Sequence, residues 1–471
     1  MRGLANALPV LAALFLCGAG CTLRGCSSGD PSWSDPEETD GLTASLGEYF
    51  ARVHGFTLDD VHWGDLHGHS RYSYDAPPAD TPEEALQYAK DPLRGDLDFV
   101  CLSEHAEMPP ANQCPAEDAD LWQSLRRLSR EYSNENPAAG RPFVVFPGWE
   151  YTNTRGLAPL FGSEAGYGHK VVLFKGFDLL PPTRTAAWGI KGSGTGRIAG
   201  TARELWQDLD AWRPLFVGTE GTVLTIPHTT SMKGIAPPQD HRTDWDAMDP
   251  DFVRPVEIIS KWGNTEGPPP AEAACVLDDT SSLVDYDAGE QDTRITIRAL
   301  LYRKWVVEGD PCFRLAFVGG TDNHTGQPGN WEERQWGTDL ALEHRGGVTG
   351  IVAAEITRDA LWSGLWAGRT LASHSGPHRP RVLVAVHTGG RHVMMGGHAA
   401  HDGSARLRVL GGEEVQRLEV VLDGCLYESV ESAVLDRTIP LAPGRHYLYV
   451  RAGRQDGEFR SFAWSSPVYL E

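Results

Sequence analysis

Residues 63–70 read Trp63-Gly64-Asp65-Leu66-His67-Gly68-His69-Ser70 and place two histidines at the end of an apolar run that starts at Val61. Side chains two positions apart on a strand point to the same side, so both imidazoles would face one space. That geometry suits a metal ion. The His-x-His pattern alone fits two polar residues in a turn equally well, so the interpretation depends on the surrounding chain.

Other short apolar runs also lead to residues that bind metals or move protons. These runs are Leu97–Leu102 before Glu104 and His105, Phe143–Phe146 before Glu150, Val223–Ile226 before His228, and Leu315–Val318 before Asp322 and His324. Glu257 lies within the run 256–259, and His169 precedes its run, 171–174. Apolar strands separated by helical segments favour a parallel α/β arrangement, in which functional groups collect at the carboxyl ends of the strands.

Helix starts and a change of texture divide the chain. Thr81-Pro82-Glu83-Glu84 and Thr357-Arg358-Asp359 are typical helix N-termini, and residues 176–200 and 262–292 are predicted to be long loops that roof the site. From residue 377 to 471, short alternating runs separated by glycine-containing turns predict an antiparallel, β-sandwich-like module. The body that carries the candidate site therefore spans residues 61–376.

The N-terminus has the pattern of an export signal. An apolar run, Leu8–Leu16, precedes the small residues 18–20 and Cys21, which resembles a bacterial lipoprotein cleavage box in which Cys21 is lipidated. Simple secretion is the alternative, and the run is too short for a retained transmembrane helix. Residues 1–21 are thus predicted to be a signal peptide and residues 22–60 a tether and lead-in, which places the protein in the cell envelope, facing the periplasm.

Composition narrows the function further. With 41% hydrophobic and 23% charged residues the 471-residue chain is typical of a globular protein, and its formal charge of -22 argues against binding to a nucleic-acid polymer. A small anionic substrate is compatible with that charge, because bound divalent cations would dominate locally. The cysteines show no C-x-x-C spacing, so a zinc knuckle is excluded, their pairing stays open and their role is predicted to be structural.

Nine residues form the candidate metal-ligand set. Imidazole and carboxylate without thiolate favour zinc, manganese or iron. The set is His67, His69, Asp75, His105, Glu150, His169, His228, Asp322 and His324.

In the order of these ligands the chain resembles the polymerase-and-histidinol-phosphatase (PHP) superfamily of metal hydrolases, and in detail its uncharacterised branch DUF3604. The histidine that is common at the third ligand position elsewhere in the superfamily is replaced here by Asp75. The branch resemblance covers nearly all of the chain from residue 61 onward. It lies in segments 73–76, 103–105, 148–151, 168–170, 227–228, 319–326, 346–350, 357–369 and 463–467.

The resemblance implies a distorted barrel of seven β/α units that holds two or three divalent metals, with nine ligands favouring three. It groups His67, His69, Glu150 and Asp322 around one metal, with Glu150 bridging. His105 and His169 would serve the neighbouring position, and Asp75, Glu150, His228 and His324 would complete the cluster.

Closely spaced divalent metals activate water for hydrolysis, and phosphate esters fit best because several ions can stabilise charge on their oxygens. We therefore predict an exported metal-dependent phosphoesterase. The alternatives are hydrolysis of an amide, lactone or sulfate ester, or a metal-bound scaffold without catalysis whose β module binds an envelope partner. Candidate catalytic or orienting residues are Glu104, Glu257 and Asn323, and candidate substrate contacts are Arg71, Lys170 and Lys261.

Overall fold

The structure, a computed structural model, describes most of the chain outside the N-terminus and several internal segments. The described residues are 36–73, 75–76, 79–107, 118–153, 168–177, 180–187, 197–211, 221–232, 241–277, 292–330, 346–376, 378–456 and 459–471. The predicted signal peptide, Cys21 and the first part of the tether lie outside them, as do parts of the two predicted roof loops.

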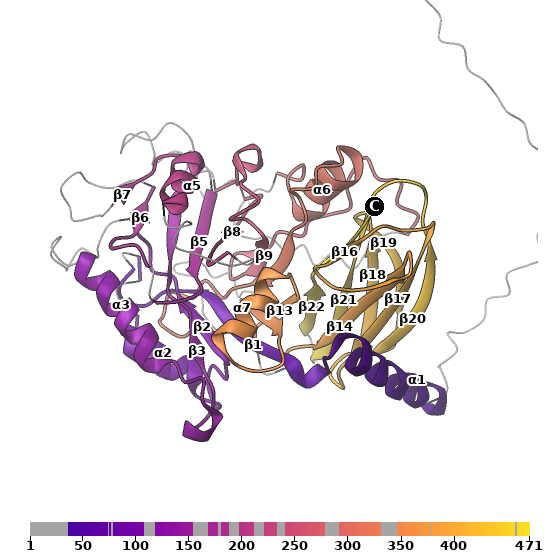
Figure 1. The fold of residues 1–471 in the computed structure, drawn as a ribbon, viewed down its shortest axis with the longest axis horizontal. Coiled ribbons are helices and arrows are strands. Elements are labelled where there is room, and N and C mark those ends of the chain that lie inside the picture. Colours follow the sequence, from indigo (N-terminus) through magenta and orange to yellow (C-terminus); the bar gives the residue numbers. More distant parts are fainter. Residues whose placement is uncertain are drawn as a thin grey trace, which may run out of the picture.

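The elements follow one another as a mixture of helices and strands, with strands in the majority (Figure 1). The α-helices are α1 (Pro36–Tyr49), α2 (Pro82–Lys90), α3 (Asp118–Tyr132), α5 (Ala202–Asp210), α6 (Ile297–Leu301) and α7 (Arg358–Trp366). Shorter helical turns are η1 (Phe50–His54), η2 (Leu58–Asp60), η4 (Pro137–Ala139), η6 (Trp245–Ala247) and η7 (Tyr302–Val307). The strands of the N-terminal body are β1 (Val61–Gly68), β2 (Phe99–Leu102), β3 (Val144–Val145), β4 (Gly148–Asn153), β5 (Gly168–Phe174), β6 (Thr185–Ala186), β7 (Arg197–Ile198), β8 (Val223–His228), β9 (Pro255–Ser260), β10 (Gly263–Asn264), β11 (Ala316–Gly319), β12 (Gly347–Val352) and β13 (Thr370–His374). The strands after residue 377 are β14 (Val382–Thr388), β15 (Arg391–Met394), β16 (His398–Ala399), β17 (Ser404–Gly411), β18 (Arg417–Leu422), β19 (Cys425–Val430), β20 (Val434–Pro440), β21 (His446–Asp456), β22 (Phe459–Ser465) and β23 (Val468–Leu470).

Parallel pairing occurs in only part of the body. Strands β1, β2 and β3 pair in parallel, as do β9 and β11. Strand β5, however, is antiparallel to both β4 and β8, and β1 is antiparallel to β12. The expectation of a parallel arrangement therefore holds only for some strands. A strand buried on both faces has the same continuous apolar run whichever way its neighbours point, so the sequence pattern does not fix the direction.

The helix starts predicted from the sequence are confirmed. At the start of α2, the Thr81 hydroxyl accepts from Glu84 N–H at 3.2 Å, and the Glu84 carboxylate accepts from Thr81 N–H at 2.9 Å. At the start of α7, the Thr357 hydroxyl accepts from Ala360 N–H. Each cap satisfies backbone donors that have no partner within the helix.

The strands after residue 377 are antiparallel, as predicted, except for a short parallel pair between β16 and β23. They form one sheet of β15, β14, β17 and β20, with helix α1 packed against β17 and β20. Their other strands continue the sheet of the body, because β22 pairs with β13. The hydrogen-bonded ladder thus crosses the predicted boundary, which itself stays a prediction.

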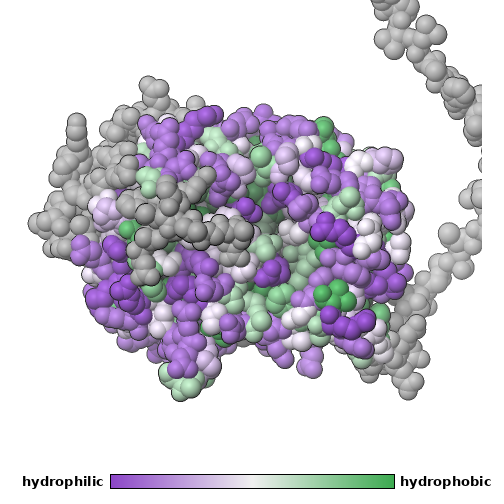
Figure 2. Space-filling model, in the orientation of Figure 1, coloured by the Kyte–Doolittle hydropathy of each residue, from purple (hydrophilic) through white to green (hydrophobic). Residues whose placement is uncertain are grey.

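The surface in Figure 2 is mostly hydrophilic, and its hydrophobic residues lie in small groups around a shallow recess near the middle of the view. None of the helices in the described part of the chain is both long enough and apolar enough to cross a membrane.

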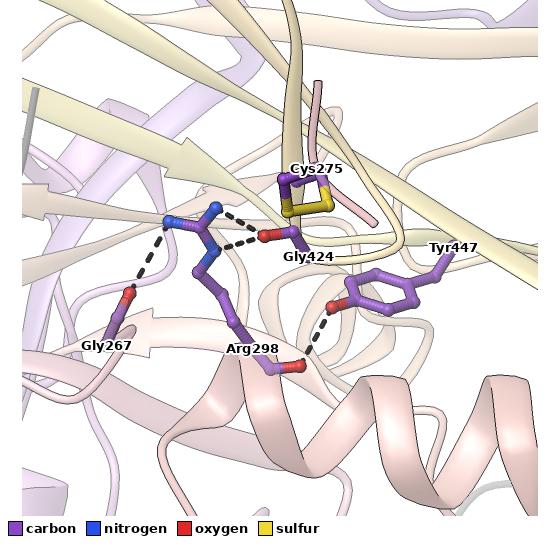
Figure 3. The surroundings of a disulfide bond; sticks show 6 residues. Gly267, Cys275, Arg298, Gly424 and Tyr447 are labelled. Atoms are coloured by element: carbon purple, nitrogen blue, oxygen red, sulfur yellow. Dashed lines mark hydrogen bonds between the residues drawn. A yellow bond between two sulfur atoms is a disulfide. The ribbon is translucent and has the colours of Figure 1, made fainter. Parts of the chain in front are cut away.

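A disulfide joins Cys275, in the segment after β10, to Cys425, the first residue of β19 (Figure 3). Its partners are separated by 150 residues along the chain. Beside it, Arg298 of α6 donates from Nε to the Gly424 carbonyl at 2.8 Å. Cys101 and Cys312 have no disulfide partner among the described residues, whereas Cys26 and Cys114 lie outside them.

Removal of the disulfide by the double substitution Cys275→Ser, Cys425→Ser is expected to lower the free energy of unfolding by about 2–5 kcal/mol, because a long closed loop strongly restricts the unfolded chain. Chemical denaturation of the oxidised protein and the variant measures the difference. The matched control is Cys312→Ser, which removes a half-buried thiol without breaking a crosslink. Equal stability of the double variant and the control would contradict the expectation.

Candidate metal centre

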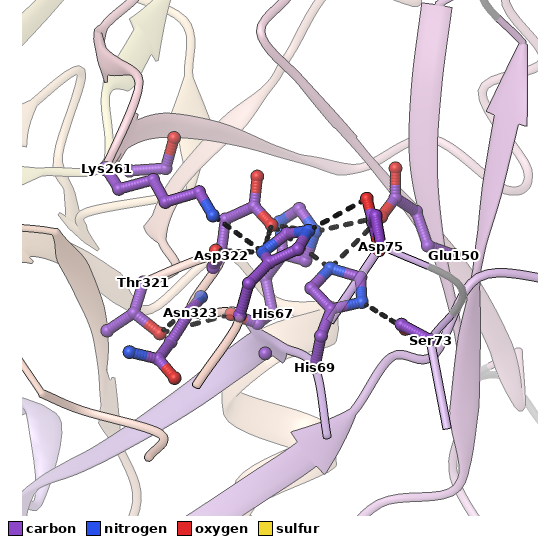
Figure 4. A network of polar contacts seen from close by, with 12 residues as sticks. His67, His69, Ser73, Asp75, Glu150, Lys261, Thr321, Asp322 and Asn323 are labelled. Carbon is purple, nitrogen blue, oxygen red and sulfur yellow. Dashed lines mark hydrogen bonds and ion pairs between the residues drawn. The ribbon is translucent and has the colours of Figure 1, made fainter. Parts of the chain in front are cut away.

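The end of β1 is fixed against the loop that follows β11. The backbone N–H of His69 donates to the Asn323 carbonyl, and the N–H of Asp322 donates to the His67 carbonyl, both at 2.7 Å. Asp322 has a φ of 51°, an unusual value for a residue with a side chain. These bonds bring the His-x-His pair and the Asp-x-His pair together, although they are far apart in sequence (Figure 4).

Glu150 of β4 lies at the centre of the site and is buried. Its two carboxylate oxygens face nitrogen atoms of five histidines. Oε2 lies 3.3 Å from nitrogens of His67, His69 and His105, and Oε1 lies 2.9 Å from His169 Nδ1 and 3.1 Å from His228 Nε2. One carboxylate is thus shared by two neighbouring groups of imidazoles.

The antiparallel direction of β5 explains why His169 precedes its apolar run. In the ladder, His169 is opposite Thr152 of β4 and His228 of β8. The start of β5 therefore lies where β4 and β8 end, and all three strands present ligand-type residues at the same end of their sheet.

Four overlapping groups of side chains place their ligand atoms within 4.8 Å of one another. They are His67, His69, Glu150 and Asp322; Glu150, His169 and His228; His69, His105 and His324; and His67, His228 and Glu257. The first matches a predicted metal position. The others differ from the predicted partition, since His169 lies with His228 instead of His105, and His105 lies with His324.

Asp75 joins the group of His105 and His324. Its Oδ2 lies 3.1 Å from His105 Nε2 and 3.2 Å from His324 Nε2. Two histidines and a carboxylate therefore converge at the more exposed edge of the cluster. All nine predicted ligands are brought together around Glu150 and this edge.

The donor set fits divalent metal ions. It consists of imidazole nitrogens and carboxylate oxygens, and two of its buried atoms, His69 Nε2 and Asp322 Oδ1, make no hydrogen bond within the described residues. Buried polar atoms are normally satisfied, so atoms that converge without hydrogen bonds indicate a place for a cation. This buried His/Glu/Asp cluster could hold metal ions.

The electrostatics of the metal-free cluster separate its histidines into two kinds. Burial opposes the charged form of His105, but Asp75 and Glu150 outweigh it and raise the pKa of His105 to about 10. The pKa values of His67 and His69 are raised in the same way by neighbouring carboxylates against the effect of burial. Burial prevails at His169 and lowers its pKa to about 4.

The carboxylates stay ionised for the complementary reason. Burial alone would raise the pKa of Glu150, but the charge of His105 and hydrogen bonds from His169 and His228 hold it well below the usual range. Asp322 is held low against burial by His67 and Lys261, and Asp75 by His105 and His324. Protonated imidazoles therefore supply the positive charge that a bound cation would bring.

Residues predicted to be catalytic lie behind the ligands. His67 Nδ1 lies 2.9 Å from the buried Glu257, which orients the ring so that Nε2 faces Glu150. Glu104 accepts from the Ser73 hydroxyl at 2.7 Å, and that oxygen lies 2.8 Å from His69 Nδ1. Carboxylates in such positions fix the orientation and basicity of a ligating histidine.

Asn323 has a different surrounding. Its side-chain oxygen accepts from Thr325 N–H and Gln327 N–H, both at 2.9 Å, and the residue is fully buried. It therefore shapes the loop that carries Asp322 and His324.

The predicted substrate contacts are placed unequally. Lys261, directly after β9, has Nζ 2.6 Å from His324 Nδ1. Lys170 is buried, and strand alternation puts it on the face of β5 opposite His169. Arg71 is exposed beside the site. Of the three, only Lys261 contacts a ligand-type residue in the distances above.

Several functional neighbours escaped the sequence analysis. Ser73 links Glu104 to His69, and the Thr152 hydroxyl lies 2.6 Å from His105 Nδ1. Thr152 is two residues from Glu150 on the same strand face, so alternation could have identified it. His241, predicted to be a surface or structural residue, has its ring 4.6 Å from that of His169 and a buried Nε2 without a hydrogen bond among the described residues. No sequence spacing signals that proximity.

Trp262 is also part of the site. Its indole N–H donates to Asp322 Oδ2, and Lys261 Nζ lies 5.0 Å from the centre of its ring. The sequence had indicated only that this tryptophan, next to a ligand segment, could shape a pocket.

Comparison with known proteins leaves the family open. No protein-family profile matches the chain, and no curated protein matches it. A crystal structure of a two-domain protein from Bacteroides vulgatus ATCC 8482, which contains a predicted PHP-like metal-dependent phosphoesterase, is 12% identical with a TM-score of 0.35 and covers 84% of this chain and 91% of that one. PsfC from Pseudomonas syringae PB-5123 is 16% identical with a TM-score of 0.31 and covers 65% and 88%. Likenesses this weak establish no family.

Metal binding at neutral pH is expected to release protons. The raised pKa of His105, about 10, and those of His67 and His69 keep these rings protonated at pH 7 in the metal-free protein, whereas a ligating imidazole must be neutral. Affinity for Zn²⁺ or Mn²⁺ should therefore rise as pH increases towards about 10, the pKa of His105. Calorimetric titration at pH 7 in buffers of different ionisation enthalpy measures the release, and a heat that is independent of the buffer would refute it.

Substitution of Glu257 by Gln is expected to weaken metal binding by about tenfold, the lower end of the range for partners of ligating histidines. The amide oxygen can still accept a hydrogen bond from His67, but it lacks the charge that makes the ring a stronger ligand. The control is Glu419→Gln, which changes a buried carboxylate of β18 bound to Arg451. Equal affinities of the two variants would show that Glu257 has no influence on the cluster.

Proposed function

We propose that this chain is a metal-dependent phosphoesterase. The observation that carries the proposal is the position of Glu150, one buried carboxylate that faces His67, His69 and His105 with one oxygen and His169 and His228 with the other. A carboxylate shared between adjacent donor groups is suited to bridging two ions. The resemblance of the motifs to the PHP superfamily supports the same conclusion.

Two or three divalent ions, zinc, manganese or iron, are proposed to occupy the site and would supply an activated water and charge neutralisation at a phosphoryl group. The chain's own residues do the rest. Glu257 and Glu104, the latter through Ser73, hold the rings of His67 and His69 in orientation. Lys261, at the edge of the cluster, is positioned to receive an anionic ester.

The substrate is proposed to be a small phosphate ester. Arg71 is exposed close to His69 in sequence and would contact such a ligand from outside, whereas the buried Lys170 would act only through β5. The acidic chain offers no basic surface for a polymer, so a nucleic acid is not part of the proposal.

The seven-unit barrel and an envelope location complete the proposal. The parallel pairs β1–β2–β3 and β9–β11 fit such a barrel, with β4, β5 and β8 as its distorted part. The disulfide supports export, because disulfides persist in oxidising compartments. Lipidation at Cys21 and anchoring to a membrane are proposed from the sequence alone.

The test is metal content by elemental mass spectrometry, combined with release of nitrophenol from mono- and bis-nitrophenyl phosphate by the reconstituted protein. Two or three bound ions, turnover that chelation abolishes, and at least a hundredfold loss in Glu150→Gln are expected. Glu131→Gln, at an exposed position on α3, is the matched control. Bound metal without turnover would favour another ester, an amide or a binding scaffold, and turnover unaffected by chelation would refute the proposal.

A further inference from the structure

The segment Lys261–Cys275, here called the bridging segment, connects the candidate metal centre to the C-terminal strands. It begins in the site, where Lys261 approaches His324 and Trp262 donates to Asp322. It ends at the disulfide with Cys425 of β19. Both ends are therefore attached, one to the ligands and one to the module.

Glu266, in the middle of the bridging segment, is the main contact with the module. Its carboxylate is only 1% exposed and accepts hydrogen bonds from the hydroxyl of Tyr449 on β21 and from Trp464 Nε1 on β22, the latter at 2.8 Å. Arg451 of β21 lies 3.6 Å from the same carboxylate. A buried carboxylate that loses such a donor is costly, so these bonds strongly fix the position of Glu266.

Arg298 fastens the next part of the segment. Its guanidinium donates to the carbonyl of Gly424 and, at 3.4 Å, to that of Gly267, while the Tyr447 hydroxyl donates to the Arg298 carbonyl at 3.0 Å (Figure 3). Gly267 has a φ of 79°, which turns the chain at this point. The same arginine thus holds the bridging segment and the turn before β19 together.

The segment is also fixed to the strand that carries Glu257. Thr265 N–H donates to the Ile258 carbonyl at 2.7 Å, and the Thr265 hydroxyl donates to the Glu257 carbonyl at 3.1 Å. A displacement at Glu266 would therefore be transmitted over few residues to Trp262 and to Glu257. Outer partners of ligands held in this way control both their orientation and their affinity for metal.

We propose that the C-terminal module is a positioning part of the metal centre, in which Tyr449 acts through Glu266 to hold Trp262 on Asp322. The proposal deepens the phosphoesterase assignment and rests on it for its catalytic meaning, but the positioning itself can be measured without turnover. Tyr449 and Glu266 are positioning residues, because neither contacts a ligand-type residue or a substrate.

The test compares Tyr449→Phe with Tyr469→Phe. Both remove one hydroxyl from a buried tyrosine of the module, but the Tyr469 hydroxyl donates to the Leu315 carbonyl and does not reach the bridging segment. Full-length protein labelled with 5-fluorotryptophan is examined by ¹⁹F NMR, with Trp262→Phe identifying the Trp262 resonance. The affinity for Mn²⁺ is measured on the same samples.

We expect Tyr449→Phe to shift or broaden the Trp262 resonance and to weaken Mn²⁺ binding about tenfold, while Tyr469→Phe changes neither. A Trp262 resonance equally unaffected in both variants would overturn the proposal. Should Tyr449→Phe fail to fold, the double variant Cys275→Ser, Cys425→Ser releases the other end of the segment and is expected to broaden the same resonance; an unchanged resonance there also overturns it. A shifted resonance in a protein without phosphoesterase activity would refute the proposed function and leave the positioning role intact.

Discussion

The buried charge of Glu150 is the constraint on which the site depends. An isolated carboxylate in the interior would be very costly, and here it is stable only because histidines from several strands bring positive charge and hydrogen bonds to it. Those strands must therefore end at the same place, whatever their direction. The antiparallel course of β5 is one consequence, since it puts His169 beside the ends of β4 and β8.

Around this centre, most of the polar side chains serve other side chains. Glu257 fixes His67, Glu104 acts through Ser73 on His69, and Trp262 donates to Asp322. The result is a set of donors with little freedom to rotate, so the cost of organising them has already been met in the folded chain. Such preorganisation is what multi-ion hydrolytic sites require.

The sequence predicted the members of the cluster better than their grouping. His67, His69 and Asp322 follow apolar runs, and a pattern of runs ending in ligands is visible without a structure. Strand direction is not, because apolar runs look alike in parallel and antiparallel sheets, and the association of His105 with His324 and of His169 with His228 depends on it. His241 could not be found at all, since its proximity to His169 arises from tertiary packing alone.

The pairing of β22 with β13 has a consequence for the order in which the chain folds. Strand β13 is bound through β12 to β1, the strand that carries the His-x-His pair, so the central sheet becomes complete only when residues near the C-terminus arrive. Contacts over such long sequence separations form slowly. A chain emerging in order from a ribosome or a translocation channel would thus hold most of its metal ligands before it has the strands that fix them in place. Capture of metal would then be a late event, which follows the docking of the last strands.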